Sequence, residues 1–281
     1  MGRHRAAVCL VVSLLAAGTL GAAPQGATAL RLRGVVLTGA GAPVQGALVR
    51  TDAVAGALGD QFTGQRQFTV TTDRRGQWNL LGLTAGVWLF EVTARGHLPH
   101  VVAMPIQMTR SALLPTISWR LTVELQPETS AGPLAGDLAR VVDLIEQKRQ
   151  SEATAALERI QLEDATPETL CAAGDISLLL RDYAGAFGLF NRAVEARPDW
   201  YRPHLGVASA SILMLDYETA AKAYWEARSL APRGDLEQAM SAAIEELGHI
   251  TGYRWIRPPV PARHAISGGR TGTRSPTRRS A

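Results

Sequence analysis

The sequence predicts a two-part β + α protein, in which a small antiparallel β-sandwich precedes a stack of α-helical hairpins. Apolar residues alternate with a period of two through residues 30–125, and the period becomes helical from about residue 137. Two stretches, "DYAGAFGLFNRAVEARPDW" from Asp182 and "DYETAAKAYWEARSLAPRG" from Asp216, resemble each other. A chain of 281 residues with 46% hydrophobic and 19% charged residues is typical of a globular protein with more than one domain.

The amino terminus has the layout of a secretory signal. Arg3 and Arg5 precede an apolar run over residues 6–20, and Ala27 and Ala29 offer small residues for cleavage. An uncleaved anchor is the alternative, but about 15 apolar residues are short for a membrane span. We therefore expect residues 1–29 to be a cleaved signal peptide and the protein to be exported, periplasmic or extracellular, with envelope association left open.

Cysteine usage excludes two kinds of site. After cleavage Cys171 is the only cysteine, so an internal disulfide and a cysteine-based metal cluster are excluded. A lone thiol in an oxidising compartment is either buried or paired between molecules. Its small apolar neighbours favour burial.

Short strands separated by turns account for residues 30–125. Apolar runs at 34–37 and 47–49 flank a turn rich in Gly and Pro, and "QFTVTTD" ends at a tight turn that closes on Gly76. Period two then places Trp88, Phe90 and Val92 on one face of a strand. Several such strands predict a small antiparallel sandwich.

These positions resemble the carboxypeptidase regulatory-like domain over about residues 31–108. The resemblance rests on spaced positions in two runs: Gly34, Val36, Gly41, Pro43, Gly46, Ala47 and Val49, then Thr72, Asp73, Gly76, Trp78, Leu80, Leu83, Gly86, Trp88, Phe90, Val92, Ala94 and Gly96. It implies a prealbumin-like sandwich of seven strands that serves as a non-catalytic module. Some members of the wider superfamily bind glycans, which keeps carbohydrate binding open.

The sandwich segment carries weak signals for chemistry. Gly39 and Gly41 lack the spacing and the following helix of a phosphate-binding loop. His97 and His100 have no third metal ligand near them in sequence, so a structural role is expected and no metal is predicted. Trp78 and Trp88 fall in the inward register, which leaves Trp119 as the freer candidate for stacking on a sugar.

Residues 126–136 are rich in Pro, Gly and small polar residues, which predicts a linker between two domains. Beyond it, five pairs of residues are each 34 positions apart: Tyr183 and Tyr217, Ala186 and Ala220, Phe190 and Tyr224, Ala193 and Ala227, Pro198 and Pro232. This pattern resembles the tetratricopeptide (TPR) repeat, with units at 167–200 and 201–234. Thr166 is expected to cap the first helix, which Pro167 opens.

The resemblance to the tetratricopeptide repeat is incomplete in the first helix of each unit. Leu170 and His204 stand where the family prefers Trp, and Ser177 and Ser211 stand at its Tyr position. Residues 137–162 read as a degenerate leading unit, and residues 235–247 as a capping helix. The helical region as a whole is expected over 137–250.

The resemblance implies a concave groove lined by the first helix of each unit. The lining positions are Glu168, Cys171, Asp175, Leu178, Arg202, Leu205, Ser209 and Ile212. The Lys and Asn residues that grip a terminal carboxylate in some members are absent from the matching positions. The groove is expected either to hold a protein or peptide segment or to pack on the sandwich or the capping helix.

Charge differs between the regions. Residues 30–126 balance to +4, residues 133–256 to −7, and the last 25 residues hold six Arg and no acid. The basic tail, 251–281, lacks periodicity and is expected to be disordered. Export and the lack of interleaved aromatics argue against nucleic acid as a partner, so folding back on the acidic helices or attraction to anionic surfaces is favoured.

Taken together, the sequence predicts an exported, non-catalytic interaction or scaffold protein without cofactors. The alternative is a carbohydrate-binding envelope protein that uses its sandwich domain. No nucleophile elbow, zinc signature or carboxylate–histidine set supports an enzyme.

Overall fold

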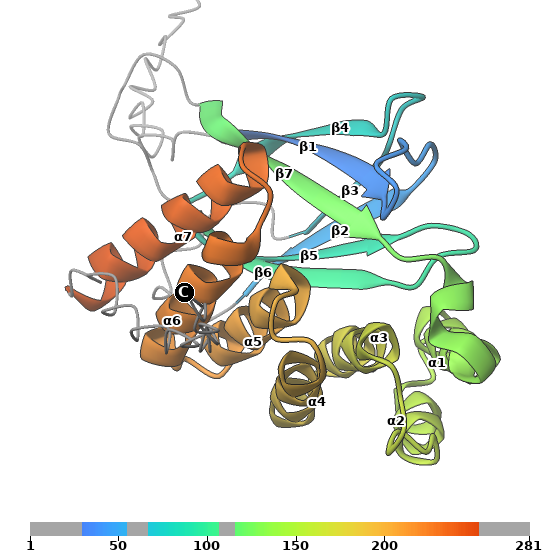
Figure 1. Ribbon diagram of the computed structural model, residues 1–281. Helices are drawn as coiled ribbons and strands as arrows, with labels where there is room; N and C mark the ends of the chain where they lie inside the picture. The colour runs from blue at the N-terminus through green and yellow to red at the C-terminus, as the bar shows by residue number, and fades with distance from the viewer. Residues whose placement is uncertain (1–29, 55–66, 107–115, 253–281) are drawn as a thin grey trace, which may run out of the picture.

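The computed structural model describes residues 30–54, 67–106 and 116–252. A β-sandwich and a layer of helices make up this part of the chain (Figure 1). The expected signal peptide and the tail from residue 253 lie outside the described residues. Within the described ranges, no helix has the length and apolar character needed to cross a membrane.

The sandwich has two sheets. One has the order β4-β1-β7 and the other β3-β2-β5-β6. The strands are β1 (Leu30–Thr38), β2 (Leu48–Ala53), β3 (Gln67–Thr71), β4 (Gln77–Leu83), β5 (Gly86–Thr93), β6 (His100–Ile106) and β7 (Thr116–Leu125). The prediction of an antiparallel sandwich is wrong for one pair, because β7 returns from the second sheet to lie parallel to β1.

The alternating residues form the core between the sheets. Trp88, Phe90 and Val92 are fully buried, as the period of two predicts. Trp78 is also buried, and its indole lies against Gly34 on the neighbouring strand: a Cβ added to Gly34 would stand 2.1 Å from ring atoms of Trp78. The glycine therefore leaves the space that the indole fills.

Helices follow the sandwich. They are η1 (Glu128–Leu134, a 3-10 helix), α1 (Ala135–Glu146), α2 (Gln150–Glu158), α3 (Pro167–Leu179), α4 (Tyr183–Ala196), α5 (Tyr201–Leu213), α6 (Tyr217–Leu230) and α7 (Asp235–Thr251). The segment expected to be a linker contains η1, which contacts α1 and α3 and buries Ala131. Thr166 caps α3 as predicted, by accepting a hydrogen bond from the backbone N–H of Thr169 (3.2 Å).

The hairpins α3–α4 and α5–α6 occupy equivalent positions 34 residues apart. Asp182 and Asp216 cap their second helices through the N–H groups of Gly185 and Thr219. Phe190 of α4 packs between the hairpins, where Gly174 of α3 and Gly206 of α5 both face its ring. The repeated sequence therefore encodes a repeated hairpin with an aromatic spacer.

The helical layer covers one side of the sandwich. Helices α3, α5 and α7 contact β6, and α7 also contacts β7 (Figure 1). Strands β6 and β7 are the end strands of their respective sheets. The helices therefore cover two sheet edges, while α1 and α2 lie beyond the sandwich at the other end of the layer.

A matched pair of glycine substitutions tests the packing of Phe190. Gly206→Ala places a Cβ 2.3 Å from the Phe190 ring, so we expect a loss of about 1–3 kcal/mol in the free energy of unfolding. Gly188 is exposed on α4, and a Cβ added there would have no atom within 4 Å. Gly188→Ala should therefore raise the free energy of unfolding by about 0.5–1 kcal/mol. Urea unfolding measures both, and equal effects would contradict the assigned packing.

Candidate functional site

The eight residues expected to line a groove lie on α3 and α5, two helices that contact β6. Seven of them are buried: Cys171, Asp175, Leu178, Arg202, Leu205, Ser209 and Ile212. Glu168 remains partly exposed and forms an ion pair with Arg197 (2.7 Å). The structure thus brings these residues together and covers them with a strand of the same chain.

Helix side chains satisfy the free backbone edge of β6. The N–H of Val101 donates to Oδ1 of Asp175 (3.2 Å), and the N–H of Ala103 donates to Oγ of Ser209 (3.1 Å). The carbonyl of Ala103 accepts a hydrogen bond from the Tyr224 hydroxyl. Pro105 continues the same register and has no N–H to satisfy, which suits an edge position.

A buried charge cluster joins the two layers at the start of β6. Arg202 of α5 contacts Asp175 of α3 through one terminal nitrogen (2.5 Å to Oδ2). Its other terminal nitrogen lies 2.5 Å from Nδ1 of His100. A guanidinium only donates, so this contact needs Nδ1 of His100 as an acceptor, with the ring proton on Nε2. The same Nδ1 also lies 3.3 Å from the carbonyl oxygen of Glu124, a longer contact that would need the other tautomer.

Burial sets the protonation of this cluster. Desolvation, together with the charge of Arg202, holds the pKa of His100 well below its usual range, so the imidazole is neutral. Burial raises the pKa of Asp175 to about 7, against the opposing effect of Arg202 and the Val101 N–H. Burial also raises the pKa of Cys171 to about 12, which makes the thiol unreactive at neutral pH.

The groove is therefore occupied by the chain itself. Of the two expected arrangements, packing on the sandwich describes the structure, because β6 supplies the extended segment that a partner would have supplied. A protein or peptide partner stays a prediction, and its expected place between the helices is filled.

Three further expectations can be compared with the structure. Trp119, proposed for sugar stacking, is 6% exposed and belongs to the sandwich core. His97 lies in the turn after β5, where its Nδ1 is 3.1 Å from the carbonyl oxygen of Arg95, and Nδ1 of His100 contacts the guanidinium group of Arg202. Among the described residues, no group of three or more His, Cys, Asp or Glu side chains could hold a metal. Cys171 is buried as predicted.

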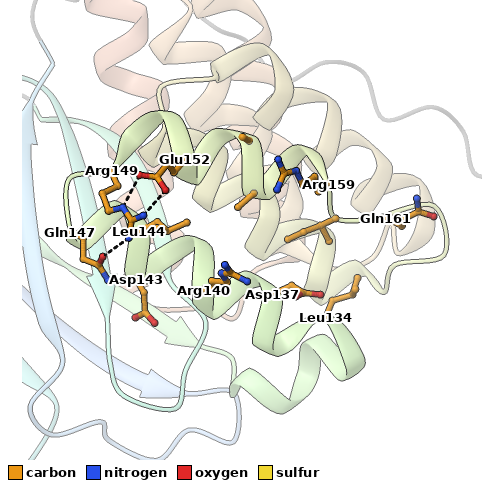
Figure 2. A pocket seen from close by; sticks show the side chains of 13 residues that line it. Leu134, Asp137, Arg140, Asp143, Leu144, Gln147, Arg149, Glu152, Arg159 and Gln161 are labelled. Atoms are coloured by element: carbon orange, nitrogen blue, oxygen red, sulfur yellow. Dashed lines mark hydrogen bonds and ion pairs between the residues drawn. The ribbon is translucent and has the colours of Figure 1, made fainter.

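The hairpin of α1 and α2 holds an open cleft of about 630 Å³ (Figure 2). Apolar side chains of Leu144, Ala156 and Ile160 form part of its lining. At the turn between the helices, Arg149 donates to Glu152 (Nε to Oε1, 2.8 Å) and to Gln147 (Nη1 to Oε1, 3.2 Å). These exposed side chains form the polar end of the cleft.

Two other guanidinium groups line the cleft. Arg140 belongs to α1, whereas Arg159 is the C-cap residue that follows α2, and both are exposed. Within the described ranges, neither has an acidic side chain within ion-pair distance. Asp137 and Asp143, three residues before and after Arg140, line the same wall. The cleft therefore combines unpaired cations with an apolar lining.

Sequence reasoning missed this cleft. Its lining residues were read only as a degenerate leading unit. The available signal was Arg140 on α1 and Arg159 just after α2, in a hairpin whose two helices are joined by a turn of three residues.

Comparison with known proteins gives weak structural likenesses alone. No protein-family model and no curated protein matches the chain. Similar solved structures include a mutant catechol 1,2-dioxygenase of Acinetobacter radioresistens, with 17% identity, 38% of this chain and 54% of that chain covered, and a TM-score of 0.29. Hydroxyquinol 1,2-dioxygenase of Pseudomonas putida DLL-E4 gives 12% identity, 36% and 57% coverage, and a TM-score of 0.29.

A third likeness is to the dioxygenase domain of a dioxygenase carbohydrate-binding protein fusion from Streptomyces sp. SirexAA-E. It has 17% identity, covers 36% of this chain and 80% of that one, and has a TM-score of 0.25. The chain spans little more than half the length of the first two structures. With TM-scores this low, no activity, metal or substrate passes from these proteins to this chain.

These comparisons correct the family and function predictions. The assignment to carboxypeptidase regulatory-like and tetratricopeptide families is wrong, since no family model matches and the similar structures named above are dioxygenases. The predictions of a non-catalytic scaffold and of a carbohydrate-binding protein rested on those two family assignments and are corrected with them; the activity of the dioxygenases is not carried over to this chain. The β + α organisation of the chain stands.

Replacing Arg202 tests the buried cluster. Arg202→Met leaves the Asp175 carboxylate buried without its cation, so we expect the free energy of unfolding to fall by about 3–5 kcal/mol. Adding Asp175→Asn to that variant should recover part of the lost free energy of unfolding, because the buried group without its cation is then uncharged. Urea unfolding of both single variants and the double variant measures the coupling, and additive effects would contradict a direct Arg202–Asp175 interaction.

The His100 pKa predicts a dependence on pH. Its folded-state pKa lies below the unfolded value of about 6.5, so the unfolded chain takes up the proton first and stability is lost as pH falls below that value. Asp175, with a raised pKa, acts in the opposite sense: its contribution is greatest below the unfolded carboxyl pKa and is lost as pH rises through about 7.

His100→Gln removes only the histidine part. The stability of this variant relative to the parent should rise by up to about 2 kcal/mol between pH 6.5 and 5, since each pH unit is worth about 1.4 kcal/mol for one proton. Urea unfolding at the two pH values is the measurement. A difference between variant and parent that stays constant with pH would show that His100 is not held neutral.

Proposed function

We propose that the protein binds a small organic carboxylate in the cleft between α1 and α2. The observation that supports this most directly is the pair of unpaired guanidinium groups, Arg140 on α1 and Arg159 at the end of α2, that line a cleft of about 630 Å³. A cleft of this size matches the range of small-molecule sites. A guanidinium group binds a carboxylate through paired, charge-assisted hydrogen bonds.

The lining favours a ligand with one charged end and an apolar body. Leu144, Ala156 and Ile160 are half-buried and offer an apolar surface to the ligand. Asp137 and Asp143 on α1 would repel a second negative charge. A monocarboxylate with an aliphatic body therefore fits better than a polyanion.

The fixed turn supports such a site. Arg149 already donates to Glu152 and Gln147, so we do not count it among the groups that bind the ligand. Helix α2 packs its buried Ala153 into the cluster that also contains Leu138 and Val141 of α1. Arg140 on α1 and Arg159 at the end of α2 thus belong to a hairpin whose opposite side is buried.

Calorimetric titration of the full chain with hexanoate and with uncharged hexanamide tests the proposal. Hexanoate should bind, while hexanamide should bind at least ten times more weakly because it lacks the charge. Arg140→Gln and Arg159→Gln should each weaken hexanoate binding about ten-fold, the equivalent of about 1.4 kcal/mol.

The matched control is Arg233→Gln, an exposed arginine before α7 that does not line the cleft. It should bind hexanoate like the parent. Equal affinity for acid and amide, or equal losses in the Arg140, Arg159 and Arg233 variants, would overturn the assignment.

A further inference from the structure

The sandwich carries a second cavity, which is independent of the helical cleft. It has a volume of about 390 Å³ and is lined by residues of β1, β3, β4 and β7, among them Arg33, Asn79 and Arg120. The buried Trp78 and Gly34 belong to its lining as well. The lining of the cavity therefore combines exposed polar side chains with buried residues of the sandwich.

The strand register places three donor side chains next to one another. Arg33 of β1 is the pairing partner of Asn79 on β4 and of Arg120 on β7. Their neighbours along each strand, such as Leu32, Leu80 and Leu121, are buried, so the three side chains share the outer face of the sheet. Adjacent strands are about 4.8 Å apart, which lets three donors from three strands surround one group.

The charges on this face are incompletely compensated. Two arginines on paired strands repel each other unless an anion lies near them. Asp235 of α7 forms an ion pair with Arg120 through Nε (3.0 Å), and Arg33 has no ion pair within the described part of the chain. Asp73 also lines the cavity, but its Oδ1 accepts from the N–H groups of Arg75 and Gln77 in its own turn.

We infer that this cavity binds a tetrahedral oxyanion, phosphate or sulfate, either free or as an ester. One arginine fork satisfies a planar carboxylate, whereas donors from three separate strands suit a group with oxygens in several directions. Arg33 and Arg120 supply charge and paired donors, and the amide of Asn79 supplies a neutral donor. Arg120 pairs with Asp235 through Nε, and its terminal nitrogens are the donors that we assign to the ligand.

Calorimetric titration of the full chain at low ionic strength with inorganic phosphate, sulfate and glycerol 3-phosphate tests this inference. The basic tail is present in every variant, so differences between variants report on the sandwich alone. Arg33→Gln should weaken phosphate binding about ten-fold or more, and Asn79→Ala should weaken it less. Preference for glycerol 3-phosphate over phosphate would identify an ester as the ligand, and the reverse a free anion.

Arg31→Gln is the matched control. Arg31 is exposed on the same strand and the same face, two residues from Arg33, but does not line the cavity. It should bind phosphate within two-fold of the parent. Equal weakening by Arg31→Gln and Arg33→Gln would reduce the effect to general surface charge and overturn the site, as would the absence of phosphate binding by the parent. Thermal unfolding confirms that each variant is folded.

Discussion

Strand β6 ends a sheet, and its free edge exposes backbone groups that must find hydrogen-bond partners once helices exclude water from them. The chain meets this requirement with side chains rather than with another strand. Asp175 and Ser209 accept from Val101 and Ala103, and Tyr224 donates to the carbonyl of Ala103. These three contacts link α3, α5 and α6 to the sandwich, beside the apolar core that the strands and helices share.

This constraint explains why buried polar residues stand among the small and apolar ones. Asp175 needs a cation once it is buried, and Arg202 provides it. Arg202 in turn meets His100, which stays neutral there. The sandwich and the helices thus share one buried interface, and the open sites lie at the periphery: the α1–α2 cleft and the outer face of the β4-β1-β7 sheet.

Local patterns in the sequence predicted local structure well. Alternation placed Trp88, Phe90 and Val92 in the core, Thr166 and Pro167 marked the start of α3, and the spacing of 34 residues located equivalent hairpins. Long-range pairing left no such signal. The parallel pairing of β1 with β7 and the filling of the groove by β6 join residues that lie 85 or more and 74 or more positions apart.

The candidate sites were the least predictable part. Arg140 and Arg159 look like ordinary surface residues in the sequence. They line one cleft only because α1 and α2 fold back on each other as a hairpin. Arg33, Asn79 and Arg120 come from three separate strands and meet only through the sheet register. The resemblance to a repeat family suggested a partner segment as one occupant of the groove on α3 and α5. In the structure, strand β6 of the same chain packs there.

Amide hydrogen exchange at Val101 and Ala103 tests the central claim most directly. Their N–H groups have helix side chains as acceptors, so both amides should exchange only through global unfolding, as slowly as the central amides of β5. Ser209→Ala should then speed exchange at Ala103 more than at Val101. Exchange of both amides at the rate of an open sheet edge, with β5 still protected, would contradict the account.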